Sequence, residues 1–347
     1  MASNTDFIYP FLFEPNLHEV VWGGTKLTAW KGLQPRDHIG ESWEVSCVES
    51  SPSVIANGAW AGHTLTEVID KYPEAILGRE VSQKYHGKLP LLMKFIDAQK
   101  DLSIQVHPDD EMAQREHGKM GKSEMWYIID AKPGSYLYAG FKQEITPEAY
   151  KQHVADGTIT DVLARHEVKT GDVFYLPAGR VHAIGAGILL AEVQQSSDVT
   201  YRIFDYNRPG MDGKPRELHT ELAAQALDYH VESEYRTIYD ENINRANLIV
   251  DSPYFSVRVT ETPESFHRNL LKYDSFVITM CIEGDCHIRL RATGEELLLR
   301  EGNSVLIPAV LADYDVIPLK LSTRFLDAFI DNMDKSLVGK VTRFLHI

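Results

Sequence analysis

Two short segments carry side chains that bind metals and move protons. In the first, strand alternation places Gln105 and His107 on one face, and a proline directly follows the histidine. In the second, the same alternation places Lys122, Glu124 and Trp126 on one face. Imidazole nitrogens and carboxylate oxygens are preferred donors to divalent ions such as zinc, and the lysine adds a cation beside them. The two segments therefore predict a metal-dependent site.

A third segment supplies one more histidine and a recognisable pattern. Gly171 begins a turn and a short apolar strand, after which Pro177 and Gly179 bend the chain toward His182. Glycine, five residues, proline, one residue, glycine, two residues and histidine match every fixed position of the second cupin signature. Together with the three earlier donors, the segment resembles the zinc site of type I mannose-6-phosphate isomerases.

The resemblance extends over essentially the whole chain, and the length is similar to that of the shorter bacterial branch. One departure is Lys122-Ser123-Glu124, where longer members have Lys-Pro-Glu, but the lysine and the ligand are kept. Further segments that resemble the family are Tyr9-Pro10-Phe11, Trp22-Gly23-Gly24, Gly40 to Ser46, Leu91 to Phe95 and Thr200-Tyr201-Arg202.

The resemblance implies one zinc ion per chain, with His107, Glu124, His182 and Gln105 as its ligands. A neutral amide such as that of Gln105 is a weak metal ligand, so Gln105 could instead orient a neighbouring ligand, and both roles stay open. Such a set leaves the ion with net positive charge, able to stabilise the charge that develops on sugar oxygens. The implied reaction interconverts mannose 6-phosphate and fructose 6-phosphate through an enediol.

Three cations are the candidate catalytic residues. Arg202 stands where the family has its active-site arginine, and its planar fork suits a phosphate or a developing oxyanion. Lys94 and Lys122 are candidates for proton transfer or phosphate binding, because burial near a metal can depress a lysine pKa. Which of the two lysines transfers the proton and which binds the phosphate is left open.

Three other functions share the expected fold. An Fe(II) oxygenase would use the same histidine and glutamate ligands, and a cupin-type glucose-6-phosphate isomerase would use the same chemistry. A non-catalytic sugar-binding cupin would lack the ligands, whereas this chain retains them. The three candidate cations favour a phosphosugar substrate.

The pattern of the chain is mainly β, because short runs rich in Val, Ile, Tyr and Phe alternate with Gly, Pro, Asp and Asn. The turn and strand Gly171 to Pro177 are echoed by Gly302 to Pro308, which favours two related units. The fold expected is two cupin-like jelly-roll barrels. The first, 1–237, is the catalytic domain with helical insertions at about 65–77, 147–163 and 216–227, and the second, 238–347, is a degenerate copy.

Composition restricts the partners. The net charge of -15 argues against nucleic acid, so an anionic substrate needs a local basic pocket. No run of apolar residues is long enough for a membrane span, and the first residues lack the pattern of a signal peptide, which predicts a cytoplasmic protein. The three cysteines, Cys47, Cys281 and Cys286, read as free thiols. Monomer and homodimer both stay open.

Overall fold

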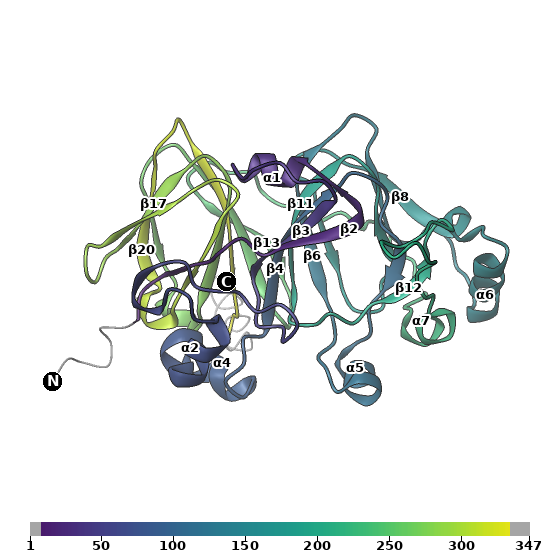
Figure 1. Ribbon diagram of the computed structural model, residues 1–347, viewed down its shortest axis with the longest axis horizontal. Helices are drawn as coiled ribbons and strands as arrows, with labels where there is room; N and C mark the ends of the chain where they lie inside the picture. Colours follow the sequence, from purple (N-terminus) through teal and green to yellow (C-terminus); the bar gives the residue numbers. More distant parts are fainter. Residues whose placement is uncertain (1–7, 334–347) are drawn as a thin grey trace, which may run out of the picture.

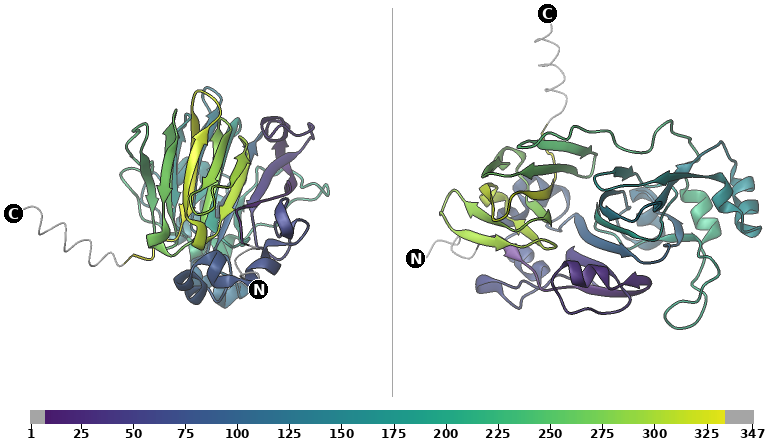
Figure 2. Two further views of the ribbon diagram at one scale, coloured as in Figure 1. Left: turned by 90° about the vertical axis from the view of Figure 1, so that its left-hand side faces the viewer. Right: turned by 90° about the horizontal axis from the view of Figure 1, so that it is seen from above.

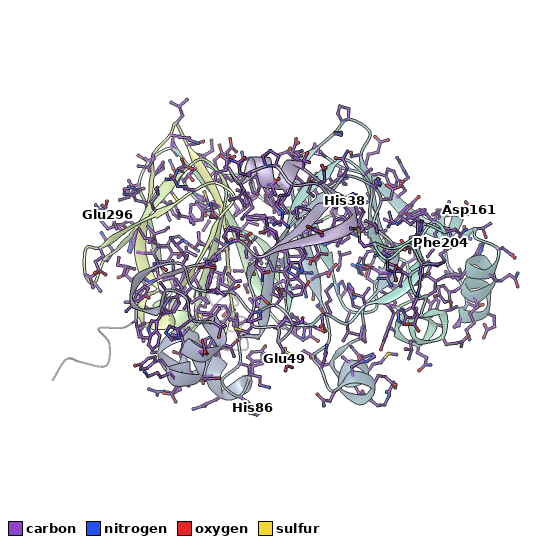
Figure 3. All side chains as sticks on the ribbon, viewed as in Figure 1. His38, Glu49, His86, Asp161, Phe204 and Glu296 are labelled. Carbon is purple, nitrogen blue, oxygen red and sulfur yellow. The ribbon has the colours of Figure 1, made fainter. Side chains whose placement is uncertain are left out.

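The computed structural model describes residues 8–333, which form four β-sheets stacked as layers (Figures 1 and 2). The two six-stranded sheets pack face to face in the middle, where residues of both share one apolar core that includes Met93, Phe95, Ile278 and Leu326. A smaller sheet covers the outer face of each six-stranded sheet. Side chains fill the spaces between the layers (Figure 3).

The first sheet pair is formed by the earlier part of the chain. Its six-stranded sheet has the order β2 (Leu17–Gly24), β3 (Ile39–Val45), β4 (Leu91–Ala98), β11 (Ile188–Gln195), β6 (Glu124–Ala131) and β9 (Val173–Leu176). Its five-stranded sheet has the order β12 (Tyr201–Phe204), β5 (Ile104–Val106), β10 (His182–Ile184), β7 (Tyr136–Phe141) and β8 (Leu163–Glu167).

The second sheet pair is formed by the later part, with one exception. Its six-stranded sheet has the order β1 (Phe11–Leu12), β19 (Ser304–Ile307), β16 (Val277–Glu283), β21 (Thr323–Phe329), β14 (Ser256–Thr262) and β13 (Ala246–Asp251). Its four-stranded sheet has the order β15 (Phe266–Asn269), β20 (Asp313–Pro318), β17 (Cys286–Leu290) and β18 (Glu296–Leu299). The exception is β1, which comes from the start of the chain and pairs with β19.

The two pairs repeat one topology. Strands β4-β11-β6-β9 of the first pair have the same order as β14-β21-β16-β19 of the second, and β5-β10-β7-β8 correspond to β15-β20-β17-β18. The repeat read from the two glycine-to-proline segments is thus a repeat of whole sheets. The predicted mainly β, cupin-like fold is confirmed, while closure of each pair into a barrel and the boundary at 237/238 stay predictions.

The helices lie at the ends and edges of the sheets and are shorter than the sequence suggests. The predicted helix at 65–77 is two helices, α2 (Leu65–Lys71) and α3 (Pro73–Leu77), because Pro73 has no N–H to continue the first. The second predicted helix ends early: α6 (Pro147–Ala155) stops before Gly157, which has φ +68°, and a 3-10 turn, Ile159–Val162, follows.

The third predicted helix begins four residues late, as α7 (Thr220–Ala226), because Arg216 pairs with Asp205 and holds its segment as a loop. Within the described residues, three α-helices were not predicted: α1 (Lys26–Trp30), α4 (Arg79–Lys84) and α5 (Asp110–His117). None of the helices within 8–333 is both long and apolar enough to cross a membrane.

Candidate metal centre and active-site cavity

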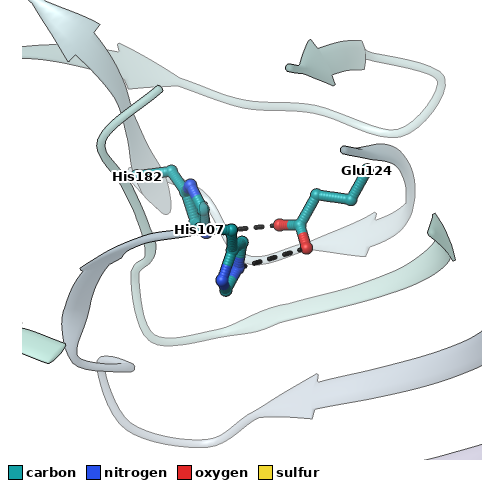
Figure 4. A group of neighbouring side chains, drawn as sticks. All are labelled: His107, Glu124 and His182. Carbon is teal, nitrogen blue, oxygen red and sulfur yellow. Dashed lines mark ion pairs between the residues drawn. The ribbon is translucent and has the colours of Figure 1, made fainter. Parts of the chain in front are cut away.

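His107, Glu124 and His182 converge inside the first sheet pair (Figure 4). His107 directly follows β5, Glu124 begins β6 and His182 begins β10, so three strand ends deliver the three side chains. One donor atom of each lies within 4.8 Å of the others. The Nε2 atoms of His107 and His182 lie 3.4 and 3.3 Å from the two oxygens of Glu124. All three residues are buried.

The hydrogen bonds around these residues prepare them for a cation. The Nδ1 of His107 donates to the carbonyl of Val199 at 2.9 Å, and the Nδ1 of His182 donates to the carbonyl of Arg180 at 2.8 Å. Each Nε2 lone pair is therefore left facing Glu124. The two oxygens of Glu124 are buried and accept no hydrogen bond of regular geometry from the described residues, and their nearest polar neighbours are the two Nε2 atoms and the ammonium of Lys122. Two imidazoles and one such carboxylate fit a divalent metal.

The protonation states agree with this fit. Burial and then the nearby Lys122 lower the pKa of His107 to about 3, and burial is the main cause that lowers the pKa of His182. For Glu124, burial works in the opposite direction, but Lys122 and the two histidines outweigh it and hold the pKa well below its usual value. Near neutral pH the site therefore offers two neutral imidazoles and one charged carboxylate.

Gln105 lies next to this group. It is the Cα partner of His182 across β5 and β10, and its Nε2 lies 3.3 Å from the Nε2 of His182. Strand alternation thus predicted the correct face for Gln105. Its amide therefore touches the same His182 nitrogen that faces Glu124, a position that suits either role expected for it.

His107, Glu124 and His182 are called the metal group below, and a cavity of about 150 Å³ adjoins them. His107 and Glu124 lie behind its wall, 1% and 0% exposed. The wall includes every other predicted site residue: Lys94, Gln105, Lys122, His182 and Arg202. The structure therefore brings all the predicted residues together.

Lys94 is enclosed by acidic groups. Its Nζ lies 3.4 Å from Glu41 and 3.4 Å from Glu192, and 5.0 Å from the centre of the Trp43 ring. Burial alone would lower the pKa of Lys94, but the two carboxylates outweigh burial and raise it. The expectation of a depressed lysine pKa is therefore wrong for Lys94, because its charged form has two counter-charges.

Lys122 bridges the cavity and the metal group. Its Nζ lies 3.1 Å from Glu124 Oε2 and 3.0 Å from the Nε2 of His107. Its side chain is only 6% exposed. The ammonium group therefore contacts two of the three metal donors and also faces the cavity.

Sequence reasoning missed Glu192, which also lines the cavity. Glu192 is the Cα partner of Lys94 on β4 and of Trp126 on β6, and it accepts a hydrogen bond from Trp126 Nε1 at 2.9 Å. Burial, and then Glu124, raises its pKa. The signal that could have found it is a carboxylate in the middle of the strand Ile188–Gln195, which is otherwise apolar up to its last two residues.

A second missed residue is Arg216, which shares the cavity wall with Arg202. The Nε and a terminal nitrogen of Arg216 donate to the two oxygens of Asp205 at 2.7 and 2.6 Å. Arg202 is the Cα partner of Gln105, and burial and then Arg216 lower its pKa. Two guanidinium groups thus give this end of the cavity positive charge in a chain that is acidic overall.

The chain is similar to mannose-6-phosphate isomerases over most of its length. Residues 11–146 match the model of the type I phosphomannose isomerase catalytic domain. Mannose-6-phosphate isomerase ManA of Bacillus subtilis is 35% identical over 88% of this chain and 95% of its own length. Mannose-6-phosphate isomerase of Streptococcus mutans is 31% identical over 88% of this chain and 94% of its own length.

Solved structures agree with these relatives. The crystal structure of mannose 6-phosphate isomerase from Bacillus subtilis superposes with a TM-score of 0.82 at 31% identity, covering 92% of this chain and 99% of that one. A putative mannosephosphate isomerase from Archaeoglobus fulgidus has the same fold, with a TM-score of 0.76 at 23% identity over 92% of this chain. Full-length similarity and a converging donor set lead to one conclusion: the chain belongs to the type I phosphomannose isomerase family.

Proposed function

We propose that the protein interconverts mannose 6-phosphate and fructose 6-phosphate, with one zinc ion bound by His107, Glu124 and His182 and with Gln105 as a fourth ligand. The observation that carries the proposal is a buried group of metal-donor side chains beside a cavity whose wall contains several lysine and arginine side chains. A bound divalent ion would supply Lewis-acid stabilisation of the charge that develops on the sugar oxygens. Relatives that match nearly the whole chain carry this activity in their names.

The isomerisation moves a proton between C2 and C1, and the cavity offers two kinds of groups for it. Lys94, held charged by two carboxylates, serves as a hydrogen-bond donor to a sugar oxygen rather than as a base. Lys122, in contact with two metal donors, is positioned to donate to an oxygen near the metal. Among the cavity groups, Glu41 and Glu192 are the carboxylates that can accept a proton from carbon.

Arg202 and Arg216 give the cavity an anionic subsite. Both are charged at any physiological pH, and Asp205 holds Arg216 in a fixed orientation through two hydrogen bonds. We assign the phosphate of the substrate to this end, which leaves the sugar carbons to the metal end. In the cell we place the activity in the cytoplasm, within mannose metabolism, and the chain acts as a monomer or a homodimer.

The first experiment follows turnover of mannose 6-phosphate in a coupled assay that detects fructose 6-phosphate. Turnover is expected to disappear on chelation, to return with zinc, and to be absent in His182→Ala. The matched control is His230→Ala, an exposed histidine away from the cavity, which is expected to behave as wild type.

Two further arms separate the alternatives. A panel that includes glucose 6-phosphate tests the choice of sugar, and loading with Fe(II) while following O2 tests the oxygenase. No turnover of mannose 6-phosphate by folded, zinc-loaded protein would remove the proposed function. Oxygen uptake that depends on His182 would replace it with the oxygenase.

A further inference from the structure

Two glutamines end β11, the strand that passes beside the metal group. Gln194 and Gln195 are 0% and 1% exposed, and they are the last two residues of a strand whose other polar side chain is Glu192. Gln194 is the Cα partner of Glu124 on β6. Buried amides are costly unless they form hydrogen bonds, so the bonds they form indicate what they hold in place.

Gln194 holds the turn that follows β11. Its Nε2 donates to the carbonyl of Gln195 at 2.9 Å and to the carbonyl of Ser197 at 2.7 Å. Two residues later, the carbonyl of Val199 accepts the Nδ1–H of His107. That last hydrogen bond selects the tautomer of His107 whose Nε2 faces Glu124. Gln194 therefore shapes the turn that presents the acceptor for a metal ligand.

Gln195 holds the segment that carries Lys122 and Glu124. Its Oε1 accepts from the backbone N–H of Ser123 at 2.8 Å, and its own N–H donates to the carbonyl of Ser123 at 3.1 Å. Its Nε2 donates to Asp110 Oδ1 at 3.0 Å. Ser123 lies between Lys122 and Glu124, so these bonds fix the backbone from which both side chains project.

We propose that Gln194 and Gln195 are positioning residues that set the metal affinity of this site, Gln194 through the His107 acceptor and Gln195 through the backbone at Ser123. The inference rests on the proposed metal centre and adds residues that belong neither to its donor group nor to the lining of the cavity. Groups that orient metal ligands typically change metal affinity by about 10- to 100-fold when they are removed.

The test measures binding of Zn²⁺ and Co²⁺ alone, by competition with a chromophoric chelator, in Gln194→Met and Gln195→Met. Methionine keeps the length of the side chain and removes its hydrogen bonds. The control is Gln152→Met, which removes an exposed hydrogen bond from Gln152 of α6 to Asp156, the residue that follows the helix. Gln195→Glu keeps the oxygen that accepts from Ser123 and replaces the amide that donates to Asp110 with a second carboxylate, so it tests the Asp110 contact separately.

Each methionine variant is expected to bind metal about 10- to 100-fold more weakly, with the control unchanged. Nitrogen-15 NMR of the metal-free proteins is expected to show a single His107 tautomer, protonated at Nδ1, in wild type and a mixture of tautomers in Gln194→Met. Folded variants, Gln195→Glu among them, that all bind within twofold of wild type would overturn the inference, even if they are less stable. Wild-type protein that binds metal no better than His182→Ala would instead remove the proposed metal centre, and isomerase turnover is measured separately.

Discussion

A buried ion pair lies inside the second sheet pair, and breaking it is expected to lower the stability of the protein by a predictable amount. Arg268 Nε donates to Asp327 Oδ2 at 2.7 Å, and the other oxygen of Asp327 accepts from Thr279 at 2.7 Å and from Tyr314 at 3.2 Å. The side chains of Arg268 and Asp327 are 6% and 0% exposed. The structure therefore predicts that either charge alone is strongly unfavourable in this interior.

Arg268→Met leaves the Asp327 carboxylate buried with two hydroxyl donors and no counter-charge. Breaking a buried pair in this way costs about 3–5 kcal/mol of unfolding free energy. With an unfolding entropy of about 2.1 cal/mol/K per residue, the melting temperature should fall by about 4–7 °C. The double variant Arg268→Met/Asp327→Leu removes both charges and should recover most of the loss.

Urea and thermal unfolding of the single and double variants check this cycle. The control is Arg289→Met, which breaks an ion pair with Asp315 from a side chain that is 42% exposed and should cost at most about 1 kcal/mol. Turnover per folded molecule should be unchanged, because the lining of the active-site cavity comes from the first sheet pair. A loss for Arg268→Met no larger than the control's, or no recovery in the double variant, would refute the reasoning.

Three other outcomes follow from the structure. Gly78→Ala should lower the unfolding free energy, measured in urea titrations, by at least about 2 kcal/mol. Gly78 has φ +92°, and an added Cβ would lie 2.0 Å from the Asp274 carbonyl oxygen. Gly62→Ala is the control and should cost less, because the space around Gly62 is open. Thr64→Ala removes the capping box formed with Glu67 at the start of α2 and should cost about 1 kcal/mol by the same measurement. Burial acts to raise the pKa of Asp205, but its hydrogen bonds with Arg216 outweigh burial and lower it, so this stabilisation is present above about pH 4 and is lost as pH falls through the folded-state pKa. Asp205→Asn should therefore lose less stability than wild type between pH 5 and pH 3.

The donor residues of the site were predictable because their signals are local. Alternation along a strand fixed the shared face of Gln105 and His107, and the glycine-proline-glycine spacing identified His182. Glu192 and Arg216 were missed because their positions depend on distant partners. Glu192 meets Lys94 only across two neighbouring strands, and Arg216 reaches the cavity only because Asp205 holds its loop. The raised pKa of Lys94 has the same non-local origin.

The fold class and its internal repeat could also be predicted from the sequence, but the way in which the four sheets pack on one another could not. Short β-rich runs indicate sheets, and the echo of Gly171 to Pro177 in Gly302 to Pro308 indicated two related units. Alternation shows that a strand has two faces, but strands such as Leu91–Ala98 are buried on both of them. Which face meets the partner sheet and which meets the site is decided by packing between distant segments.

The pairing of β1 with β19 has a consequence for the order in which the protein folds. Phe11 and Leu12 pair with Leu306 and Val305, about 290 residues later in the chain. At a synthesis rate of about 5–20 residues per second, the partner strand emerges from the ribosome roughly 15–60 s after β1. The edge position beside β19 is thus filled by a segment made long before its neighbour, and contacts of such sequence separation slow folding. The first strand of the chain is therefore among the last that can reach its place in a sheet.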